Sequence, residues 1–432
     1  MSGTQQALRF PQGFLWGTAT SAHQVEGGNT NNQWWAWEQE GGHIRDGTTS
    51  GLACDHYNRF EEDFALAQEL GQNAHRLSIE WSRIEPEEGR WDENEVEHYR
   101  RVMDSLHRHG LTPFATLHHF TNPIWFEEQG GWTSPRAPDL IARYAGHMAK
   151  QLGDAVPFWL TINEPSVVPA ACFLAGMHPP AKRDMPLAMA AARHILIAHG
   201  KMYEAIREAA PHSPQIGPVL NMIDVQPASD SEEDRQAAQL FDMYWNTYWL
   251  EGIKNGVVGP PAGGGEEVPG LKGTWDVIGL NNYSRSVIAA GPPPMGIRQV
   301  QPGPDAETST MGWEVYPEGF YRVQARLKPY GKPIYITENG IGTDEDEQRC
   351  RLIIRNLREV QRAISEGVDV RSYLHWSFQD NFEWAEGFRQ KFGLVAMEEG
   401  TRNRLPRPSA HMFRDIARAN AVSDELLKRH GE

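Results

Sequence analysis

The stretch PIYITENGIGTDEDEQRCRLIIRNLREVQRAISEGVDVRSYLHWS (333–377) contains two apolar runs separated by a helical pattern. The runs 333–340 and 370–377 are apolar on both faces, which is typical of strands in a covered parallel sheet. Between them, apolar residues recur at steps of four, three and four: Ile353, Leu357, Val360 and Ile364. Gly367 follows as a helix cap, so the stretch predicts a strand, a helix and a second, parallel strand.

The same alternation runs through the whole chain. Eight runs are rich in β-branched and aromatic residues: FLWGTATSA (14–22), AHRLSIEW (74–81), TPFATLHH (112–119), FWLTINEP (158–165), QIGPVLNM (215–222), WDVIGLNNY (275–283), PIYITENG (333–340) and VRSYLHWS (370–377). A second helical pattern, 93–110, carries an apolar face: Val96, Tyr99, Met103 and Leu106. Eight strands alternating with helices predict an α/β fold, a single-domain (β/α)8 TIM barrel over residues 1–432. A doubly wound open sheet is the structural alternative.

The composition excludes several classes of partner. The 432 residues are 40% hydrophobic and 23% charged, as in a globular protein with a large core. Lys and Arg number 41 against 57 Asp and Glu, and the net charge of −16 disfavours nucleic acid or an anionic membrane. The opening MSGTQQALRFPQGF lacks the basic and apolar regions of a targeting segment, and no window approaches an uninterrupted membrane span. We therefore expect neither a nucleic-acid nor a membrane partner.

The cysteines and histidines indicate no metal site. Cys54, Cys172 and Cys350 are odd in number and show no CxxC spacing, which suits the reducing cytosol better than a disulfide framework. His118 and His119 are adjacent, so on a strand their side chains would point to opposite faces. With no cofactor motif present, we expect a cytoplasmic protein that uses neither metal nor cofactor.

Two stretches rich in Pro and Gly interrupt the rhythm. VVGPPAGGGEEVPGLKG (257–273) and AAGPPPMGIRQVQPGPDAETST (289–310) predict long loops on either side of the sixth strand. The glycines of the first stretch lack the Lys and Ser/Thr of a phosphate-binding loop, so nucleotide binding is not expected.

The side chains that matter should lie where the strands end. In a barrel the active site lies at the C-terminal ends of the strands, so polar and aromatic residues in or after the runs are expected to converge. These residues are Gln24, Glu26, Arg76, His119, Asn163, Glu164, Asn281, Tyr283, Glu338 and Trp376. Amides and carboxylates bind hydroxyl groups, and a Trp face packs against the apolar side of a sugar ring. The set predicts a polyhydroxylated small-molecule ligand.

Two of these residues are acids at the ends of apolar strands. TINEP (161–165) contains Glu164, and ITENG (336–340) contains Glu338. Burial makes a charge costly, and both acids would be structural only if each had a buried Arg partner. Two carboxylates across a sugar pocket instead suggest glycoside hydrolysis, with one as general acid and the other as base or nucleophile.

At these residues the sequence resembles glycoside hydrolase family 1, the β-glucosidase family. The resemblance covers almost the whole chain and rests on several motifs in the order and spacing of the family. These are FLWGTATSAHQVEG (14–27), RLSIEWSRIEP (76–86), TINEP, MGWEVYPEGF (311–320), YITENG (335–340) and WSFQDNFEWAEGF (376–388).

The resemblance implies a role for each matching residue. Glu164 would be the acid/base and Glu338 the nucleophile of a retaining, exo-acting β-glucosidase that acts on β-glycosides or cello-oligosaccharides. Arg76 and Tyr283 would hydrogen-bond Glu338 and keep it ionised, and Asn281 would support Glu164 or the sugar. Residues implied to bind the sugar are Gln24, His119, Asn163, Asn281, Tyr283, Trp376, Glu383 and Trp384, with Trp376 as the platform. Retention predicts carboxyl oxygens about 5 to 5.5 Å apart.

A few positions depart from the family pattern or decide between alternatives. Phe120 stands where Trp is usual, and Phe378 and Gln379 replace two Leu. We interpret both departures as core variation rather than as changes beside or behind the sugar site. Members that act on 6-phosphoglycosides usually carry Ser at the position of Glu383, and a carboxylate would repel the phosphate. Glu383 therefore favours a neutral sugar, with side activity on β-galactosides and β-fucosides. The alternatives are a 6-phospho-β-glycosidase and a non-catalytic carbohydrate-binding barrel.

Overall fold

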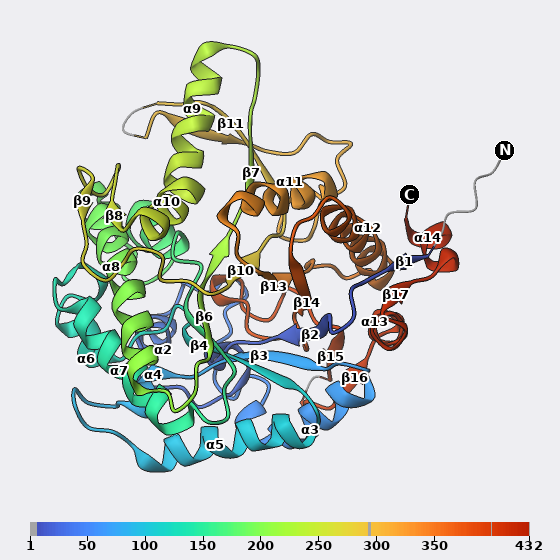
Figure 1. Cartoon of the computed structure of the whole chain (residues 1–432), viewed down its shortest axis with the longest axis horizontal. Coiled ribbons are helices and arrows are strands. Elements are labelled where there is room, and N and C mark those ends of the chain that lie inside the picture. The colour runs from blue at the N-terminus through green and yellow to red at the C-terminus, as the bar shows by residue number, and fades with distance from the viewer. Residues whose placement is uncertain (1–6, 293–294, 399, 432) are drawn as a thin grey trace.

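The computed structural model describes residues 7–292, 295–398 and 400–431. Within these residues, eight parallel strands form a closed barrel (Figure 1). In chain order they are β2 (Leu15–Ala19), β3 (Ala74–Ser78), β4 (Thr112–His118), β5 (Phe158–Asn163), β6 (Gln215–Asn221), β10 (Ile278–Asn281), β13 (Ile334–Asn339) and β14 (Val370–Trp376). Each strand lies inside one predicted run, and β14 pairs with β2 to close the barrel. The barrel prediction is confirmed, and the open-sheet alternative is wrong.

A helix follows each barrel strand and covers it from outside (Figure 1). These helices are α3 (His56–Glu69), α5 (Glu93–Arg108), α7 (Ala137–Leu152), α8 (Met185–Ala209), α10 (Tyr248–Asn255), α11 (Pro317–Leu327), α12 (Asp346–Ser365) and α13 (Pro408–Ala419). The two helices predicted from apolar periodicity, α5 and α12, are confirmed, and their apolar faces pack into the core between helices and barrel.

The ends of these helices explain how the chain turns back into the next strand. After α12, Gly367 has a positive φ of 83°, and its N–H donates to the Ile364 carbonyl at 2.9 Å. The Val368 N–H donates to the Ala363 carbonyl at 3.0 Å, which completes a glycine cap that satisfies two of the last carbonyls. Helix α5 ends in the same way at Gly110. These two glycine caps therefore set the reversal from α12 into β14 and from α5 into β4.

Among the described residues, the two Pro- and Gly-rich stretches flank β10 and are mostly loop, as predicted, but each also contains short strands that were not predicted. In 257–273, β8 (Val257–Val258) pairs antiparallel with β9 (Glu266–Glu267), and the segment leads into the N-terminal end of β10, away from the site. Around 289–310, β11 (Arg285–Ala290) pairs with β12 (Ile297–Val300) and with β7 (Asp224–Pro227). Helix α9 (Glu232–Asp242) packs on this small sheet through Ala237 and Ala238 against Ile288 (Figure 1). Short strands in and beside these stretches pair antiparallel with one another, and the high Pro and Gly content did not indicate these strands.

Shorter elements complete the fold. The strands β1 (Leu8–Arg9) and β17 (Ala421–Val422) pair and so join the two ends of the chain, and β15 (Val395–Met397) pairs with β16 (Arg404–Pro406). The short helices are α1 (Ala22–Val25), α2 (Gln33–Glu40), α4 (Trp81–Ile84), α6 (Ile124–Glu128) and α14 (Asp424–His430). The 3-10 helices η1 (Gly131–Thr133), η4 (Lys328–Tyr330) and η5 (Trp384–Glu386) and the π-helices η2 (Val168–Leu174) and η3 (Met243–Thr247) complete the set.

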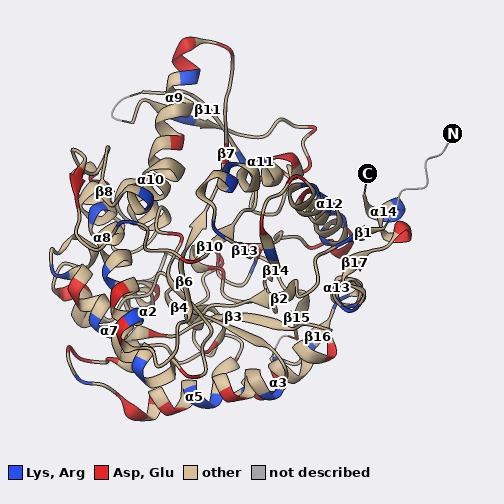
Figure 2. Cartoon of the chain, in the orientation of Figure 1, with Lys and Arg blue, Asp and Glu red and all other residues tan. Residues whose placement is uncertain are grey.

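An apolar cluster closes one end of the barrel. Its members come from six barrel strands and from the residue before β10: Ala74, Phe114, Leu160, Val219, Val277, Tyr335 and Leu374. Because this layer fills the barrel interior, the polar strand ends can meet only at the C-terminal mouth. Acidic and basic residues lie mainly along the outer helices (Figure 2). Among the described helices, none is both long and apolar enough to cross a membrane.

Candidate active site

The structure brings the sequence-predicted site residues together at the C-terminal mouth of the barrel. Three of them are the last residues of β5, β10 and β14: Asn163, Asn281 and Trp376. The others lie within a barrel strand, directly after one, or in the segments that follow: Gln24, Arg76, His119, Glu164, Tyr283, Glu338, Glu383 and Trp384. Apart from Glu26, which is treated below, the strand ends therefore converge as predicted.

Glu338 lies between a cation and a hydroxyl. Its carboxylate is 4% exposed, Arg76 donates to Oε1, and the Tyr283 hydroxyl donates to Oε2 at 2.6 Å. Arg76 is itself fully buried on β3 and is held by Thr116, whose Oγ1 accepts from Nε at 3.0 Å. Both carboxylate oxygens are thus fixed, and the negative charge has a buried counter-charge.

A chain of amides links Glu338 to Glu164. Arg76 Nη2 donates to Asn163 Oδ1 at 2.7 Å, and Asn281 Nδ2 lies 3.2 Å from the same oxygen. Asn281 also donates to Glu164 Oε1 at 2.9 Å, and its own oxygen accepts from Thr337 Oγ1 at 2.8 Å. The two acids therefore belong to one hydrogen-bonded unit with a single arginine at one end.

The surroundings of Glu164 favour its protonated form. Burial raises the pKa of Glu164 to about 7, the negative charge of Glu338 adds to the rise, and hydrogen bonds from Asn281 and Asn221 oppose it. Among the described ion pairs Glu164 has no arginine or lysine partner, so the structural alternative, which needed a buried Arg for each acid, is wrong.

A third carboxyl group lies on the other side of the pocket. Gln24 Nε2 donates to the Phe382 carbonyl at 2.9 Å and lies 3.3 Å from Glu383 Oε2. Burial raises the pKa of Glu383 to about 8, reinforced by the charges of Glu338 and Glu164. Glu383 is therefore protonated and not the charged carboxylate that was expected to repel a phosphate, and this edge of the pocket offers an amide and a carboxyl group to neutral hydroxyls.

Flat rings wall the pocket. The His119 ring stacks on Trp376, with centroids 5.9 Å apart, and on Trp384 at 6.1 Å. Burial, and then the charge of Arg76, hold the pKa of His119 well below its usual value, so the ring is neutral. Phe120 meets Trp384 edge-on at 5.3 Å, so an aromatic surface is present although the Trp usual at this position is absent.

Three residues at this mouth have a strained backbone conformation. Phe120 (φ 71°), Glu164 (φ 45°) and Trp384 (φ 49°) all adopt the left-handed region, which residues other than glycine rarely occupy. The Glu164 N–H is fixed there by donating to the Val219 carbonyl at 2.8 Å. Strained non-glycine residues are frequent at functional sites, because the surrounding fold holds them where the chemistry needs them.

Some residues are placed differently from the sequence prediction, and some were missed. Glu26 was expected to converge with the strand ends, but its carboxylate accepts hydrogen bonds from Arg83 and Tyr99 instead of facing the pocket. The short helix α1 lies between β2 and Glu26, so Glu26 does not directly follow the strand. Phe378 and Gln379 are buried, and Phe378 belongs to the main core, which supports core variation. Asn221, which hydrogen-bonds Glu164, was missed although it lies in the fifth predicted run and is the last residue of β6.

The described residues contain no cluster of three or more His, Cys, Asp or Glu arranged to hold a metal ion.

One carboxylate paired with a cation, and a second kept protonated by burial, are what cleavage of a glycosidic bond requires. The fold and this pocket together define a glycoside hydrolase.

Comparison with known proteins identifies the family. The profile of Glycosyl hydrolase family 1 matches residues 6–422. Beta-glucosidase A of Thermotoga maritima is 34% identical over 96% of this chain and 99% of its own length. A beta-glycosidase from Pyrococcus horikoshii has a similar structure, with a TM-score of 0.92, 39% identity and 99% of both chains covered. The family 1 beta-glucosidase of Thermotoga maritima in complex with glucoimidazole has a TM-score of 0.89, with 33% identity over 95% of this chain and 99% of that one.

The chain belongs to glycosyl hydrolase family 1 and is a glycoside hydrolase. The family resemblance, the fold and the enzyme class expected from the sequence are confirmed.

Proposed function

We propose that the protein is a retaining, exo-acting β-glycosidase with a preference for β-glucosides. The observation that carries the proposal is the contrast between the two acids. Glu338 is paired with Arg76 and Tyr283, whereas Glu164 has its pKa raised to about 7 and is bonded only by amides. The apolar layer fills the barrel interior, so a sugar chain could enter only from the C-terminal mouth, which suits the end of a chain better than its middle.

In the first step Glu338 is the nucleophile. Its carboxylate oxygen forms a bond to the anomeric carbon while the bond from that carbon to the leaving oxygen breaks. Glu164 gives its proton to the leaving oxygen, so the alcohol departs neutral. Arg76 and Tyr283 hold both oxygens of Glu338 and so aim the attacking lone pair.

In the second step the roles follow from the change in charge. Once Glu338 is an ester, its negative charge no longer raises the pKa of Glu164, so Glu164 can hold a negative charge and accept a proton from water. The water oxygen forms a bond to the anomeric carbon and the ester bond breaks, which regenerates Glu338. Two inversions at one carbon give overall retention.

The sugar would be recognised by neutral hydrogen-bonding groups. Gln24 and Glu383 face hydroxyls at the edge, and Trp376 is the platform, with His119, Asn163, Asn281, Tyr283 and Trp384 completing the contacts. Glucosides, galactosides and fucosides differ at hydroxyls that Gln24 and Glu383 would contact, so activity on β-galactosides and β-fucosides accompanies the main one. The Thermotoga maritima relative is named a beta-glucosidase, which supports the choice of the main substrate.

Three further parts of the proposal concern the whole chain. We propose that residues 1–432 act as one catalytic domain, because a single barrel core runs from β2 to β14. The substrates would be small β-glycosides, including cello-oligosaccharides from cellulose degradation. Cytoplasmic localisation is supported by the cysteines, since Cys54, Cys172 and Cys350 are all free thiols.

Initial hydrolysis rates on a panel of aryl glycosides test the proposal. The panel holds the β-glucoside, β-galactoside, β-fucoside, β-mannoside and 6-phospho-β-glucoside, with Glu338→Gln as the control protein. We expect the β-glucoside to be hydrolysed fastest and the phosphorylated glucoside to be the poorest substrate. Activity confined to the 6-phosphoglucoside, or no activity on any of the five, would contradict the proposal.

A further inference from the structure

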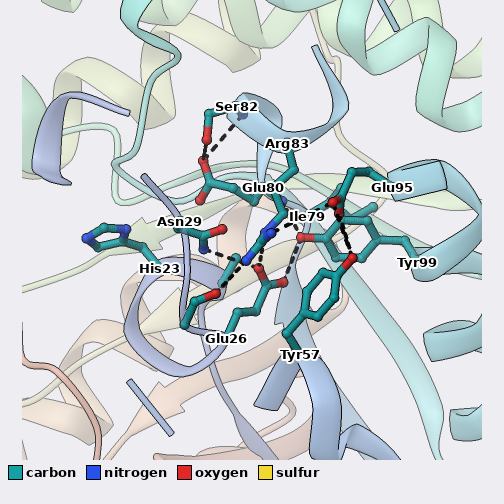
Figure 3. Close-up of polar contacts among 12 residues, drawn as sticks. His23, Glu26, Asn29, Tyr57, Ile79, Glu80, Ser82, Arg83, Glu95 and Tyr99 are labelled. Carbon is teal, nitrogen blue, oxygen red and sulfur yellow. Dashed lines mark hydrogen bonds and ion pairs between the residues drawn. The ribbon is translucent and has the colours of Figure 1, made fainter. Parts of the chain in front are cut away.

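Outside the pocket, Glu26 lies at the centre of a buried polar cluster (Figure 3). It is the residue after α1 and is 4% exposed. Arg83 Nε donates to its Oε2 at 2.9 Å, the Tyr99 hydroxyl donates to its Oε1 at 2.6 Å, and Asn29 Nδ2 lies 3.2 Å from Oε2. We call Glu26, Arg83 and Tyr99 the Glu26 clasp.

Arg83 holds the backbone of this segment as well as its carboxylate. It comes from α4, and its Nη2 donates to the Gly27 carbonyl at 2.5 Å. The guanidinium lies 4.4 Å from the centre of the Tyr57 ring and 3.8 Å from Glu95. Its side chain is 14% exposed, so these interactions are little screened by solvent. This site uses a planar group that stacks on a ring and donates to two separate acceptors, which lysine does not supply.

Tyr99 joins the clasp to two other parts of the barrel wall. Its hydroxyl accepts from the Glu80 N–H at 2.9 Å while donating to Glu26, so both of its hydrogen-bonding capacities are used. Glu80 precedes α4, two residues after the end of β3, and Tyr99 lies on α5 (Figure 3). The position of Glu26 is therefore set by residues from α4 and α5, which pack around the barrel.

The segment that the clasp holds carries two pocket contacts. Helix α1 has only four residues, too few for a helix to be stable by itself. It presents Gln24, whose amide reaches Glu383, and His23, whose ring stacks on Trp384 with centroids 5.9 Å apart. The clasp contacts the chain directly after α1, at Glu26, which is two residues after Gln24.

We propose that Arg83 is a positioning residue for sugar recognition: by holding Glu26 and Gly27 it fixes where α1 presents Gln24, and so sets how well the pocket distinguishes β-glucosides from β-galactosides. The inference rests on the proposed function, in which Gln24 and Glu383 contact the hydroxyls that differ between these sugars. Arg83 touches neither the sugar nor the two acids, so it acts on discrimination and not on the chemical step.

Replacing Arg83 with Lys tests this, because the variant keeps the positive charge but loses the planar guanidinium that contacts Glu26, Gly27 and the Tyr57 ring. Arg207→Lys is the matched control. Arg207 also lies over a tyrosine ring, at 5.2 Å from Tyr203, pairs with Asp276 and donates to the Pro214 carbonyl at 2.8 Å. Its partners stand before β6 and β10, at the closed end of the barrel.

The values of kcat and KM are measured for aryl β-glucoside and aryl β-galactoside. For Arg83→Lys we expect about fivefold lower kcat/KM on the glucoside, mostly through KM, and a glucoside-to-galactoside ratio about threefold closer to one, the size of a displaced hydrogen bond. Arg207→Lys should leave that ratio unchanged even where it lowers the melting temperature. An unchanged ratio in Arg83→Lys, or an equal change in Arg207→Lys, would overturn the inference.

Two further variants keep the test decisive if Arg83→Lys folds poorly. Tyr99→Phe removes only the hydroxyl that donates to Glu26 and should move the ratio in the same direction by a smaller factor. In a Gln24→Ala background, Arg83→Lys and Tyr99→Phe should change the ratio no further, because the effect passes through Gln24. Fully additive changes would overturn the inference. If the wild-type protein hydrolyses neither substrate, the proposed function itself is wrong, whereas an active wild type with an unmoved ratio contradicts only the role of Arg83.

Discussion

The two sides of the pocket hold the same side chain in opposite settings. On the side of β13, Glu338 receives a guanidinium on one oxygen and a phenol on the other, and on the side of β5, Glu164 receives amide groups alone. Burial is nearly equal, at 4% and 7% exposed, so burial alone does not separate them. The buried cation beside Glu338, and the negative charge that Glu338 places near Glu164, make one a nucleophile and the other an acid.

Removing the nucleophile should give the largest effect. Glu338→Gln keeps the size of the side chain but removes the charge that attacks the anomeric carbon. We expect kcat on aryl β-glucoside to fall by roughly 10⁴-fold or more, measured with the release of the aryl alcohol.

Glu127→Gln is the control for this change. Burial raises the pKa of Glu127 to about 7, like that of Glu164. Glu127 accepts its hydrogen bond from Asn122 Nδ2, at 2.6 Å, and not from a pocket residue. It should retain activity close to that of the wild type. Comparable losses in the two variants would mean that replacing any buried carboxyl group disturbs the fold. The loss in Glu338→Gln would then be no evidence that Glu338 is the nucleophile.

Removing the acid should give an effect that depends on the leaving group. In Glu164→Gln no proton can be given to the departing oxygen, which matters for an alkyl alcohol and little for an acidic phenol. We expect roughly a 10³-fold loss of kcat/KM on an alkyl β-glucoside and a much smaller loss on 2,4-dinitrophenyl β-glucoside. Equal losses on both substrates, measured in parallel, would show that Glu164 does not protonate the leaving group.

The pH dependence should report the surroundings of Glu164 directly. The first step needs Glu164 protonated and its pKa is about 7, so kcat/KM should be lost as the pH rises through about 7. Asn281 donates to Glu164 and lowers that pKa, so Asn281→Ala should move the loss to higher pH, by about half a unit. A shift toward lower pH, or none, would contradict the role of this hydrogen bond.

The smallest effect concerns a buried amide that takes no part in the reaction. Gln379 is fully buried, and among the described residues its amide finds only the weak thiol of Cys54. Gln379→Leu should therefore raise stability by about 1 kcal/mol, seen as a higher midpoint of thermal unfolding with activity unchanged.

The matched variant Gln390→Leu should have the opposite sign. Gln390 is also buried, but its amide donates to Glu386 Oε2 at 3.1 Å and accepts from Thr310. Removing it leaves two partners unsatisfied. Stabilisation by both variants would mean that apolar burial alone decides the outcome at these positions.

The barrel could be predicted from the sequence because its signals are local. Each strand is a short apolar run, and the helices that follow carry periodic apolar faces and glycine caps such as Gly110 and Gly367. The small sheet of β7, β11 and β12 could not be predicted, because β7 pairs with β11 across a long separation in sequence and β12 lies in a Pro- and Gly-rich stretch.

The site was predictable to the extent that residues end strands. Glu164, Glu338 and Asn281 follow from that rule together with the family resemblance. Glu26 did not obey it, since α1 intervenes and turns its carboxylate toward Arg83. The Arg83 contacts join four separate segments of the chain, and no spacing in the sequence reports such a tertiary arrangement.

Trapping the covalent intermediate tests the central claim most directly. A 2-deoxy-2-fluoro-β-glucoside with a good leaving group slows the second step more than the departure of the leaving group, so the glycosyl-enzyme accumulates and can be mapped by peptide mass spectrometry. We predict one added fluoroglucosyl group on the peptide that contains Glu338, with Glu164 unmodified. Label on a different residue, or no label together with a first-formed sugar of inverted anomeric configuration, would contradict the assignment of Glu338 as the nucleophile of a retaining enzyme.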